Sequence, residues 1–134
     1  MEISAGGIIF NTEKKVVIVE QKHKTYSFPK GHLKINEKLL NCAYREIYEE
    51  TGIFKQELKF IRKLGFFKRR CSKTDKIKRI HLYLFKTNKK ELKPLDIENP
   101  SAFWVNFDDV GKILTHKEDI LFFSNKFNTF LKEK

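Results

Sequence analysis

Residues 31–53 constrain the fold of this chain most strongly, because they predict one helix whose two sides differ in chemistry. Asn36 is a candidate N-cap, and Gly52 is the expected left-handed residue that ends the helix. At about 100° per residue, Glu46 and Glu50 lie about 40° apart on the helical wheel. The adjoining side of the helix is apolar and carries Leu40, Ala43 and Ile47. The sequence therefore predicts a helix that buries one side and presents an acidic edge.

The acidic edge holds three carboxylates, those of Glu46, Glu49 and Glu50. Glu46 and Glu50 form an i,i+4 like-charge pair, which costs about 0.2–0.5 kcal/mol in an isolated helix. Only Arg45 is placed to offset this repulsion locally, by pairing with Glu49. Oxygen ligands on a rigid helix suit a hard cation such as Mg²⁺ or Mn²⁺. Because glutamate is also a favoured helix former, the carboxylates alone fit a solvated helix face equally well.

The spacing of these residues resembles that of the Nudix box. The matching positions are Gly31, Glu37, Arg45, Glu46, Ile47, Glu49, Glu50, Gly52 and Ile53. The resemblance implies a Nudix hydrolase with an α/β (α+β) fold, the α/β/α sandwich built on a mixed β-sheet. It also implies a single Nudix hydrolase domain over residues 1–134, with the box at residues 31–53.

Composition is consistent with one globular domain. The chain has 134 residues, of which 40% are hydrophobic and 13 are phenylalanine. No apolar run approaches the roughly 20 residues of a membrane span, and the N-terminal residues lack the basic segment of a signal peptide. The two cysteines, Cys42 and Cys71, are not clustered, and Cys42 is expected in the helix core. We therefore expect a cytoplasmic protein, a monomer with no membrane partner.

The formal net charge of +11 favours a polyanionic partner. Nucleic acid and a small-molecule polyphosphate both fit this charge, which does not choose between them.

The order of elements follows from hydrophobic periodicity and turn residues. Residues 4–10 and 15–20 predict a hairpin, and Gly6 and Gly7 within it predict close approach by a ligand or backbone, or a β-bulge. Residues 57–67 and the alternating run 80–85 predict a second, long hairpin.

The tip of that second hairpin is strongly basic, and we expect it either to contact phosphates or RNA or to be solvated. Its cationic residues are Lys68, Arg69, Arg70, Lys73, Lys76 and Lys78.

The C-terminal part predicts one more strand and then helix. Residues 102–105 are the strand, and residues 106–110 begin a helix capped by Asn106 or Asp108. Thr115 and Glu118 form a capping box for a last helix that reaches about Leu131.

The segment just before the box carries candidate substrate contacts. Lys30 is placed to meet a phosphate as a point charge, or is a plain surface lysine. Gly31 can adopt backbone angles that aim its carbonyl into the site, and the resemblance implies that this carbonyl is a metal ligand. His32 is either a phosphate contact or an ordinary loop histidine.

Together these residues suggest hydrolysis of a phosphoanhydride, with metal and cations providing most of the catalysis. The metal ligands implied are Gly31, Glu46, Glu49 and Glu50. The general base is either Glu49 or Glu98, and Arg45 is expected to orient Glu49. Glu37 can reach the site only if the helix begins after it.

Flanking residues are similar to those of one branch, the asymmetrical diadenosine tetraphosphate hydrolases, which form ATP and AMP. They are the runs SAGGIIF and FPKGH and a glutamate ahead of FWV. A tyrosine common in that branch is replaced here, so Phe66 or Phe67 would stack on adenine without supplying a hydroxyl. Lys68 beside them suits either a long polyphosphate chain or the triphosphate of an RNA 5′ end.

Two alternatives stay open at this stage. One is another Nudix pyrophosphohydrolase, acting on oxidised nucleoside triphosphates or RNA 5′ ends. The other is a basic RNA-binding module without turnover, which has no reason to keep three carboxylates beside a polyanion.

Overall fold

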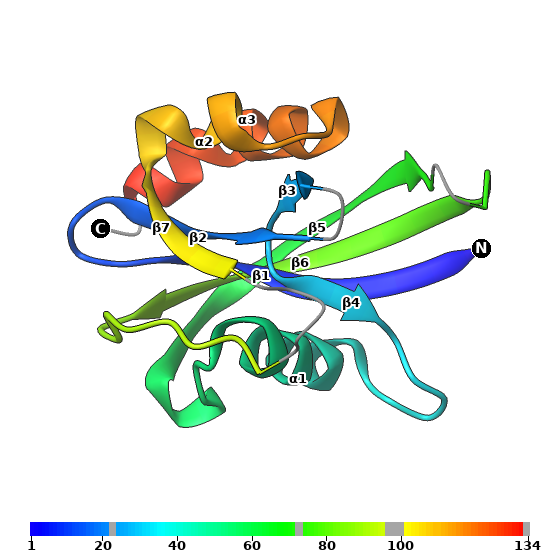
Figure 1. Cartoon of the computed structure of the whole chain (residues 1–134), viewed down its shortest axis with the longest axis horizontal. Helices are drawn as coiled ribbons and strands as arrows, with labels where there is room; N and C mark the ends of the chain where they lie inside the picture. The colour runs from blue at the N-terminus through cyan, green and yellow to red at the C-terminus, as the bar shows by residue number, and fades with distance from the viewer. Residues whose placement is uncertain (22–23, 72–73, 96–100, 133–134) are drawn as a thin grey trace.

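A mixed β-sheet separates two layers of helix, with α1 on one face and α2 and α3 on the other (Figure 1). The computed structural model describes residues 1–21, 24–71, 74–95 and 101–132, and only the backbone of residues 127–132. This arrangement confirms the predicted α/β/α sandwich.

The strands are β1 (Glu2–Phe10), β2 (Lys15–Glu20), β3 (Tyr26–Ser27), β4 (Lys30–His32), β5 (Leu58–Arg70), β6 (Ile77–Thr87) and β7 (Ser101–Asn106). The helices are α1 (Leu39–Thr51), α2 (Phe107–Ile113) and α3 (Lys117–Lys132), with a 3₁₀ turn η2 (Lys55–Glu57) after α1. The main strand order is β3-β2-β1-β6-β5, while β4 pairs with β1 and β7 pairs with β2. Only the β1–β6 pair is parallel among the described strands, which makes the sheet mixed as predicted. No helix in these described ranges is long and apolar enough to span a membrane.

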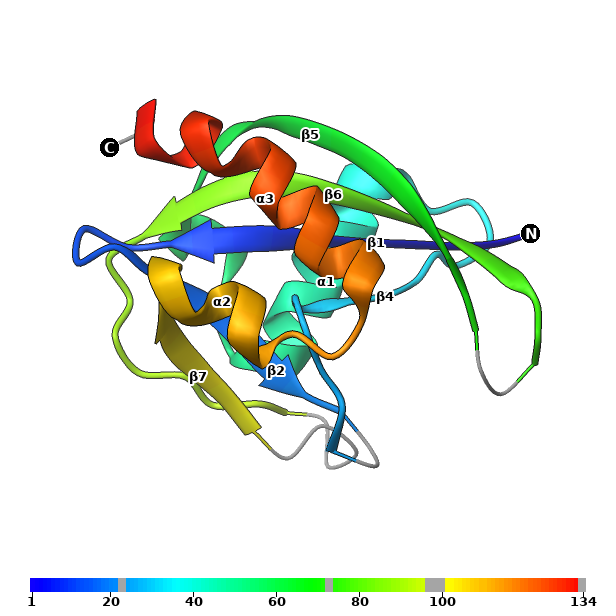
Figure 2. The same cartoon turned by 90° about the horizontal axis from the view of Figure 1, so that it is seen from above.

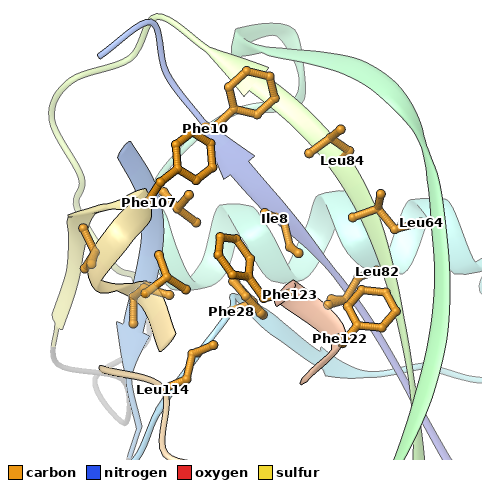
Figure 3. Close-up of a cluster of buried hydrophobic side chains, with 14 of the residues drawn as sticks. Ile8, Phe10, Phe28, Leu64, Leu82, Leu84, Phe107, Leu114, Phe122 and Phe123 are labelled. Carbon is orange, nitrogen blue, oxygen red and sulfur yellow. The ribbon is translucent and has the colours of Figure 1, made fainter. Parts of the chain in front are cut away.

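Two hydrophobic layers fix the helices to the sheet. On the α2–α3 face, large side chains from all parts of the chain meet (Figure 3). They include Ile8, Phe10, Phe28, Leu82, Leu84, Phe107, Phe122 and Phe123. On the opposite face, Ala43 and Ile47 of α1 pack against Ala5, Ile9 and Phe85. The apolar side of the predicted helix is therefore the buried side.

Both predicted hairpins are present, and the second is longer than expected. Strand β5 continues to Arg70 and β6 already begins at Ile77 (Figure 2). Lys68, Arg69 and Lys78 were assigned to a loop, but each lies on a strand and pairs across the ladder. This difference matters because alternate strand residues point to opposite faces of the sheet.

The two glycines of β1 accommodate another stretch of backbone. The amide of Gly7 donates to the Pro29 carbonyl at 3.1 Å, and a Cβ on Gly6 would lie 2.5 Å from the Cβ of Lys30. Close approach of backbone therefore explains Gly6, whereas a Cβ on Gly7 would lie 2.7–2.9 Å from the side chains of Phe85 and Ile47.

Two helix starts were predicted wrongly. Asn36 has φ 64° in a turn, and α1 begins only at Leu39, after Lys38, with no side-chain cap. Glu37 holds this turn, because its carboxylate accepts the amide of Lys34 at 3.0 Å. Helix α3 starts one residue later than a Thr115 cap requires, and the Thr115 hydroxyl instead accepts the amide of Tyr26 at 2.8 Å.

Two helix boundaries agree with the sequence. Gly52 ends α1 with φ 79°, as predicted. Helix α2 follows Asn106, although without a side-chain cap bond.

Candidate active site

The acidic edge of α1 lies directly over strand β4. The Glu46 carboxylate is packed against the α-carbon of Gly31, so that a Cβ there would lie 2.5 Å from Oε2 and closer still to Oε1. The Glu50 side chain is only 4% exposed, and its Oε1 accepts the backbone amide of Lys30 at 3.2 Å. The structure thus brings Gly31, Lys30, Glu46 and Glu50 together.

Glu49 occupies a different position, at the solvent-facing side of the same edge. Its side chain is 40% exposed, and both of its oxygens lie 3.3–3.4 Å from Nη1 of Arg45. It is therefore the most accessible of the three carboxylates.

Arg45 connects the helix to the segment before it. Its Nη1 donates to Glu46 at 2.7 Å, its Nε donates to Glu37 at 2.7 Å, and its Nη2 donates to the His32 carbonyl at 2.9 Å. The expected contact with Glu49 is present but is longer than these. The hydrogen bond from Arg45 lowers the pKa of Glu37 to about 2, so Glu37 is an anion that holds Arg45 in place. Glu37 was expected to reach the site only if the helix begins after it, and α1 does begin after it, at Leu39.

The opposite wall of the site is cationic. Burial lowers the pKa of Lys30, and the positive charges of Lys78 and Arg69 lower it further. Burial and the nearby charges of Lys78 and Lys30 also lower the pKa of His32, although Glu2 opposes them. A cleft of about 350 Å³ runs between this wall and α1. Its lining includes Gln21, Lys30, Gly31, His32, Arg45, Glu46, Glu50 and Lys78.

His116 and Asp119 near this wall were not predicted, whereas Lys78 and Arg69 were predicted only as part of the basic tip. Burial lowers the pKa of His116, and the charges of Arg69 and Lys78 lower it further. Burial raises the pKa of Asp119, and the same two cations oppose that rise. Asp119 is fully buried and forms an ion pair with Arg69 at 3.5 Å. Alternation along β5 and β6 is the signal that finds Arg69 and Lys78, and it has no meaning when the segment is treated as a loop.

The same alternation separates the predicted aromatic contacts. Phe67 faces α3, where its ring lies 5.0 Å from that of Phe122, on the same side as Arg69. Phe66 and Lys68 point to the opposite face of the sheet, since alternate residues do so. That face is the one α1 covers, but Phe66 lies three strand spacings, roughly 14 Å, from Gly31 in one row across the sheet, so the structure does not bring Phe66 and Lys68 together with the carboxylates.

The donor set fits a hard divalent cation. The pKa values of Glu46 and Glu50 are raised by burial, so an adjacent cation would favour their charged forms. Together with Glu49 and the Gly31 carbonyl they supply only oxygen donors, as Mg²⁺ and Mn²⁺ prefer. In the described part of the chain no three His, Cys, Asp or Glu side chains already converge on one point, because Arg45 contacts both Glu46 and Glu49.

Glu98, the other candidate base, lies outside the described residues, as does Lys73 of the basic tip.

Comparison with known proteins identifies the family of the chain. A family model for the NUDIX domain matches residues 2–125, so the chain belongs to the Nudix family. Members of this family generally use divalent metals such as Mg²⁺ or Mn²⁺.

The chain is 30% identical over 95 residues to an 8-oxo-dGTP diphosphatase of Buchnera aphidicola, covering 69% of this chain and 71% of that protein. It is 39% identical over 57 residues to phosphatase NudJ of Escherichia coli, covering 40% of this chain and 37% of NudJ. Matches to three further curated relatives also cover only 35–42% of their lengths.

Among solved structures, a binary complex of the Caenorhabditis elegans Ap4A hydrolase superposes with a TM-score of 0.86 and 22% identity, over 100% of both chains. This likeness establishes the fold.

Proposed function

We propose that this protein hydrolyses a phosphoanhydride bond of a nucleotide in a reaction that depends on a divalent metal. The observation that carries the proposal is the pairing of two walls in one cleft. Buried Glu46 and Glu50 on α1 face Lys30 and Lys78 on the sheet. A polyphosphate needs both walls, because its charge must be neutralised by a metal on one side and by side-chain cations on the other.

Bound by Glu46, Glu49, Glu50 and the Gly31 carbonyl, Mg²⁺ or Mn²⁺ would supply charge neutralisation and polarisation of the phosphoanhydride. The chain's own residues perform the remaining work. Arg45 and Gly31 hold the Glu46 carboxylate in position, the former by a hydrogen bond and the latter by leaving space.

We assign the phosphate-binding residues from their charge and the general base from its accessibility. Lys30 and Lys78 bind phosphate oxygens of the substrate and neutralise part of their charge. Glu49 is the candidate general base, since it is the most exposed carboxylate and is held only by the longer contacts of Arg45. Glu98 is the rival base.

For the substrate, we propose diadenosine tetraphosphate, cleaved to ATP and AMP. The sequence patterns around the box support this choice, as does the fold likeness to the C. elegans enzyme along the whole chain. Two cations, Lys30 and Lys78, line the cleft, which suits a chain of phosphates. Phe67, rather than Phe66, is the phenylalanine placed on this side of the sheet to meet a base.

A second candidate is hydrolysis of a nucleoside triphosphate to the monophosphate and pyrophosphate. The 30% identity to an 8-oxo-dGTP diphosphatase over most of the chain favours it. The triphosphate of an RNA 5′ end presents the same chemistry to the cleft.

A substrate panel read out by product identity tests both candidates. Diadenosine tetraphosphate, dGTP, 8-oxo-dGTP and a 5′-triphosphorylated RNA are each incubated with Mg²⁺ and separated by ion-exchange chromatography. ATP and AMP in equal amounts from the dinucleotide, at the highest kcat/KM of the panel, support the first proposal. Pyrophosphate release from a triphosphate at higher kcat/KM favours the second. No metal-dependent turnover of any of these substrates refutes both.

A further inference from the structure

The β5–β6 hairpin carries an aromatic and basic surface on the side facing away from α3. Phe66 is 47% exposed there, and the guanidinium carbon of Arg79 lies 4.6 Å from the centre of its ring. The His81 ring lies next to the same ring, with the ring centres 5.3 Å apart and tilted by 40°. Strand alternation places Lys68 on this side too. A register shift between Lys63 and Gly65 brings Lys63 to the same side, opposite Tyr83, and its Nζ lies 6.0 Å from the centre of the Tyr83 ring. We call this surface, made of Lys63, Phe66, Lys68, Arg79 and His81, the hairpin face.

The polar groups of the hairpin face are not used within the fold. Arg79 Nε and His81 Nδ1 are buried, and neither has a hydrogen-bond partner in the part of the chain that the structure describes. No described acidic side chain forms an ion pair with Lys63, Lys68 or Arg79. The guanidinium of Arg79 is instead laid against an exposed ring, an arrangement that offers a flat cationic and aromatic platform.

The hairpin face is separate from the catalytic cleft. Phe66, His81, Ala5 and Gly31 lie in one row across β5, β6, β1 and β4. Three strand spacings of about 4.8 Å put Phe66 roughly 14 Å from Gly31. Ala5, between them, is fully buried against the α1 layer. Lys78, which lines the cleft, pairs with Arg69 on the other side of the sheet from Phe66.

We propose that the hairpin face binds single-stranded nucleic acid, as a site distinct from the cleft. An exposed ring paired with a guanidinium plane can stack on any unpaired base, while Lys63 and Lys68 can neutralise the flanking phosphates. In a duplex the base faces are stacked on one another, so a duplex would contact Lys63 and Lys68 but could not stack on the ring of Phe66. The net charge of +11 supplies the long-range attraction for such a partner.

Binding is measured by fluorescence anisotropy with labelled single strands of about 12 nucleotides, within the range of known single-strand sites. The probes are oligo-uridine RNA and oligo-thymidine DNA, both with a 5′-hydroxyl end. EDTA in the buffer stops metal-dependent turnover. Neither probe contains a phosphoanhydride, so the result is independent of the proposed hydrolysis.

Phe66→Ala is expected to weaken binding by about 5- to 150-fold, the range for loss of one stacked base. Phe66→Leu keeps apolar bulk without a ring and should weaken binding similarly even if the alanine variant folds poorly. The matched control is Phe54→Ala. Phe54 is also about half exposed, at 50%, and its ring centre lies 4.8 Å from that of Tyr48, outside the hairpin face. This control should bind as the wild type does.

A second arm measures charge. Lys68→Gln should reduce the slope of log affinity against log salt by about 0.7, the value for one phosphate contact to a single strand. Lys112→Gln, on the exposed side of α2, should leave the slope unchanged.

Loss of binding to either probe in both Phe66 variants, with intact controls, supports the proposal. Phe66 variants that bind as tightly as Phe54→Ala overturn it. A duplex of the same length that binds as tightly as the single strands also overturns it. So does a larger loss of binding in Lys30→Gln than in Lys68→Gln, because binding would then occur in the cleft.

Discussion

Gly31 gives the sharpest test of how the site is built. The sequence suggested that this glycine is needed for unusual backbone angles, but its φ is not positive. What requires glycine is the Glu46 carboxylate, which occupies the space of a side chain. We therefore predict that Gly31→Ala damages catalysis without unfolding the protein.

The size of the effect follows from the overlap. A Cβ at position 31 would lie 2.5 Å from the farther Glu46 oxygen and nearer to the other. Ordinary contacts between such atoms begin at about 3.5 Å, so the carboxylate must withdraw by about 1 Å or more. A shift of that size in a catalytic group lowers the rate by about 100-fold, which corresponds to roughly 2.7 kcal/mol of transition-state stabilisation. The fold is spared because the atoms that must move are the end of one side chain.

The assay compares kcat for the best substrate in Mg²⁺ with the free energy of unfolding in urea. Gly111→Ala is the matched control, since a Cβ there meets nothing nearer than 3.7 Å. Because Gly111 lies within α2, this control should gain about 0.5–1 kcal/mol of stability at full activity.

A double-mutant cycle identifies the cause. If Gly31→Ala acts by displacing Glu46, then Glu46→Asp should cost far less in the Gly31→Ala background than alone. Near-normal kcat for Gly31→Ala, or additive losses in the double variant, would refute the reasoning.

Three further perturbations give distinct outcomes. Glu49→Gln should lower kcat by about 10²- to 10⁴-fold, as loss of a general base does, and should leave the urea midpoint unchanged because the side chain is exposed; normal turnover would leave Glu98 as the base. Lys30→Ala should raise KM more than it lowers kcat, since we assign this lysine to phosphate binding, and unchanged kinetics would show that it has no such role. Burial lowers the pKa of His81, and the charges of Lys63 and Arg79 lower it further. As the pH drops from about 7, His81 therefore takes up a proton in the unfolded chain before it does so in the folded protein, and the free energy of unfolding falls. His81→Gln should flatten that fall by up to about 1.4 kcal/mol per pH unit, measured by urea unfolding between pH 7 and pH 5, and an unchanged slope would contradict the shift.

The residues that could be predicted from the sequence are those whose role is local. The order of strands and helices, the acidic edge of α1 and the left-handed Gly52 all depend on neighbours within a few positions. Asn36 was predicted wrongly as the N-cap. Glu37 pairs with Arg45, eight residues away, and this contact keeps the preceding turn out of the helix.

The cationic wall could not be predicted in this way, because it is assembled by pairing between distant segments. Lys78 lines the cleft and pairs with Arg69 in the ladder between β5 and β6, and the side of the sheet on which both lie depends on where those strands end. Treating residues 68–78 as a loop removed that information. Phe66 and Phe67 lie within the predicted strand 57–67 but were left as alternatives, and the structure places them on opposite sides of the sheet.

The cleft exists because β1 changes partners along its length. Residues 4–6 pair with β4, whereas Phe10 pairs with β2, and β6 follows β1 throughout. The change occurs where Gly7 donates to Pro29 and where Gly6 leaves no Cβ to obstruct Lys30. The next residue of β4, Gly31, in turn leaves room for Glu46. Missing side chains on both strands thus let strand β4, the Lys30 side chain and the Glu46 carboxylate approach one another. From the sequence, the two glycines of β1 indicate only that a neighbour approaches them closely. They do not identify Pro29 and Lys30 as that neighbour, because β2 lies between β1 and these residues in the chain.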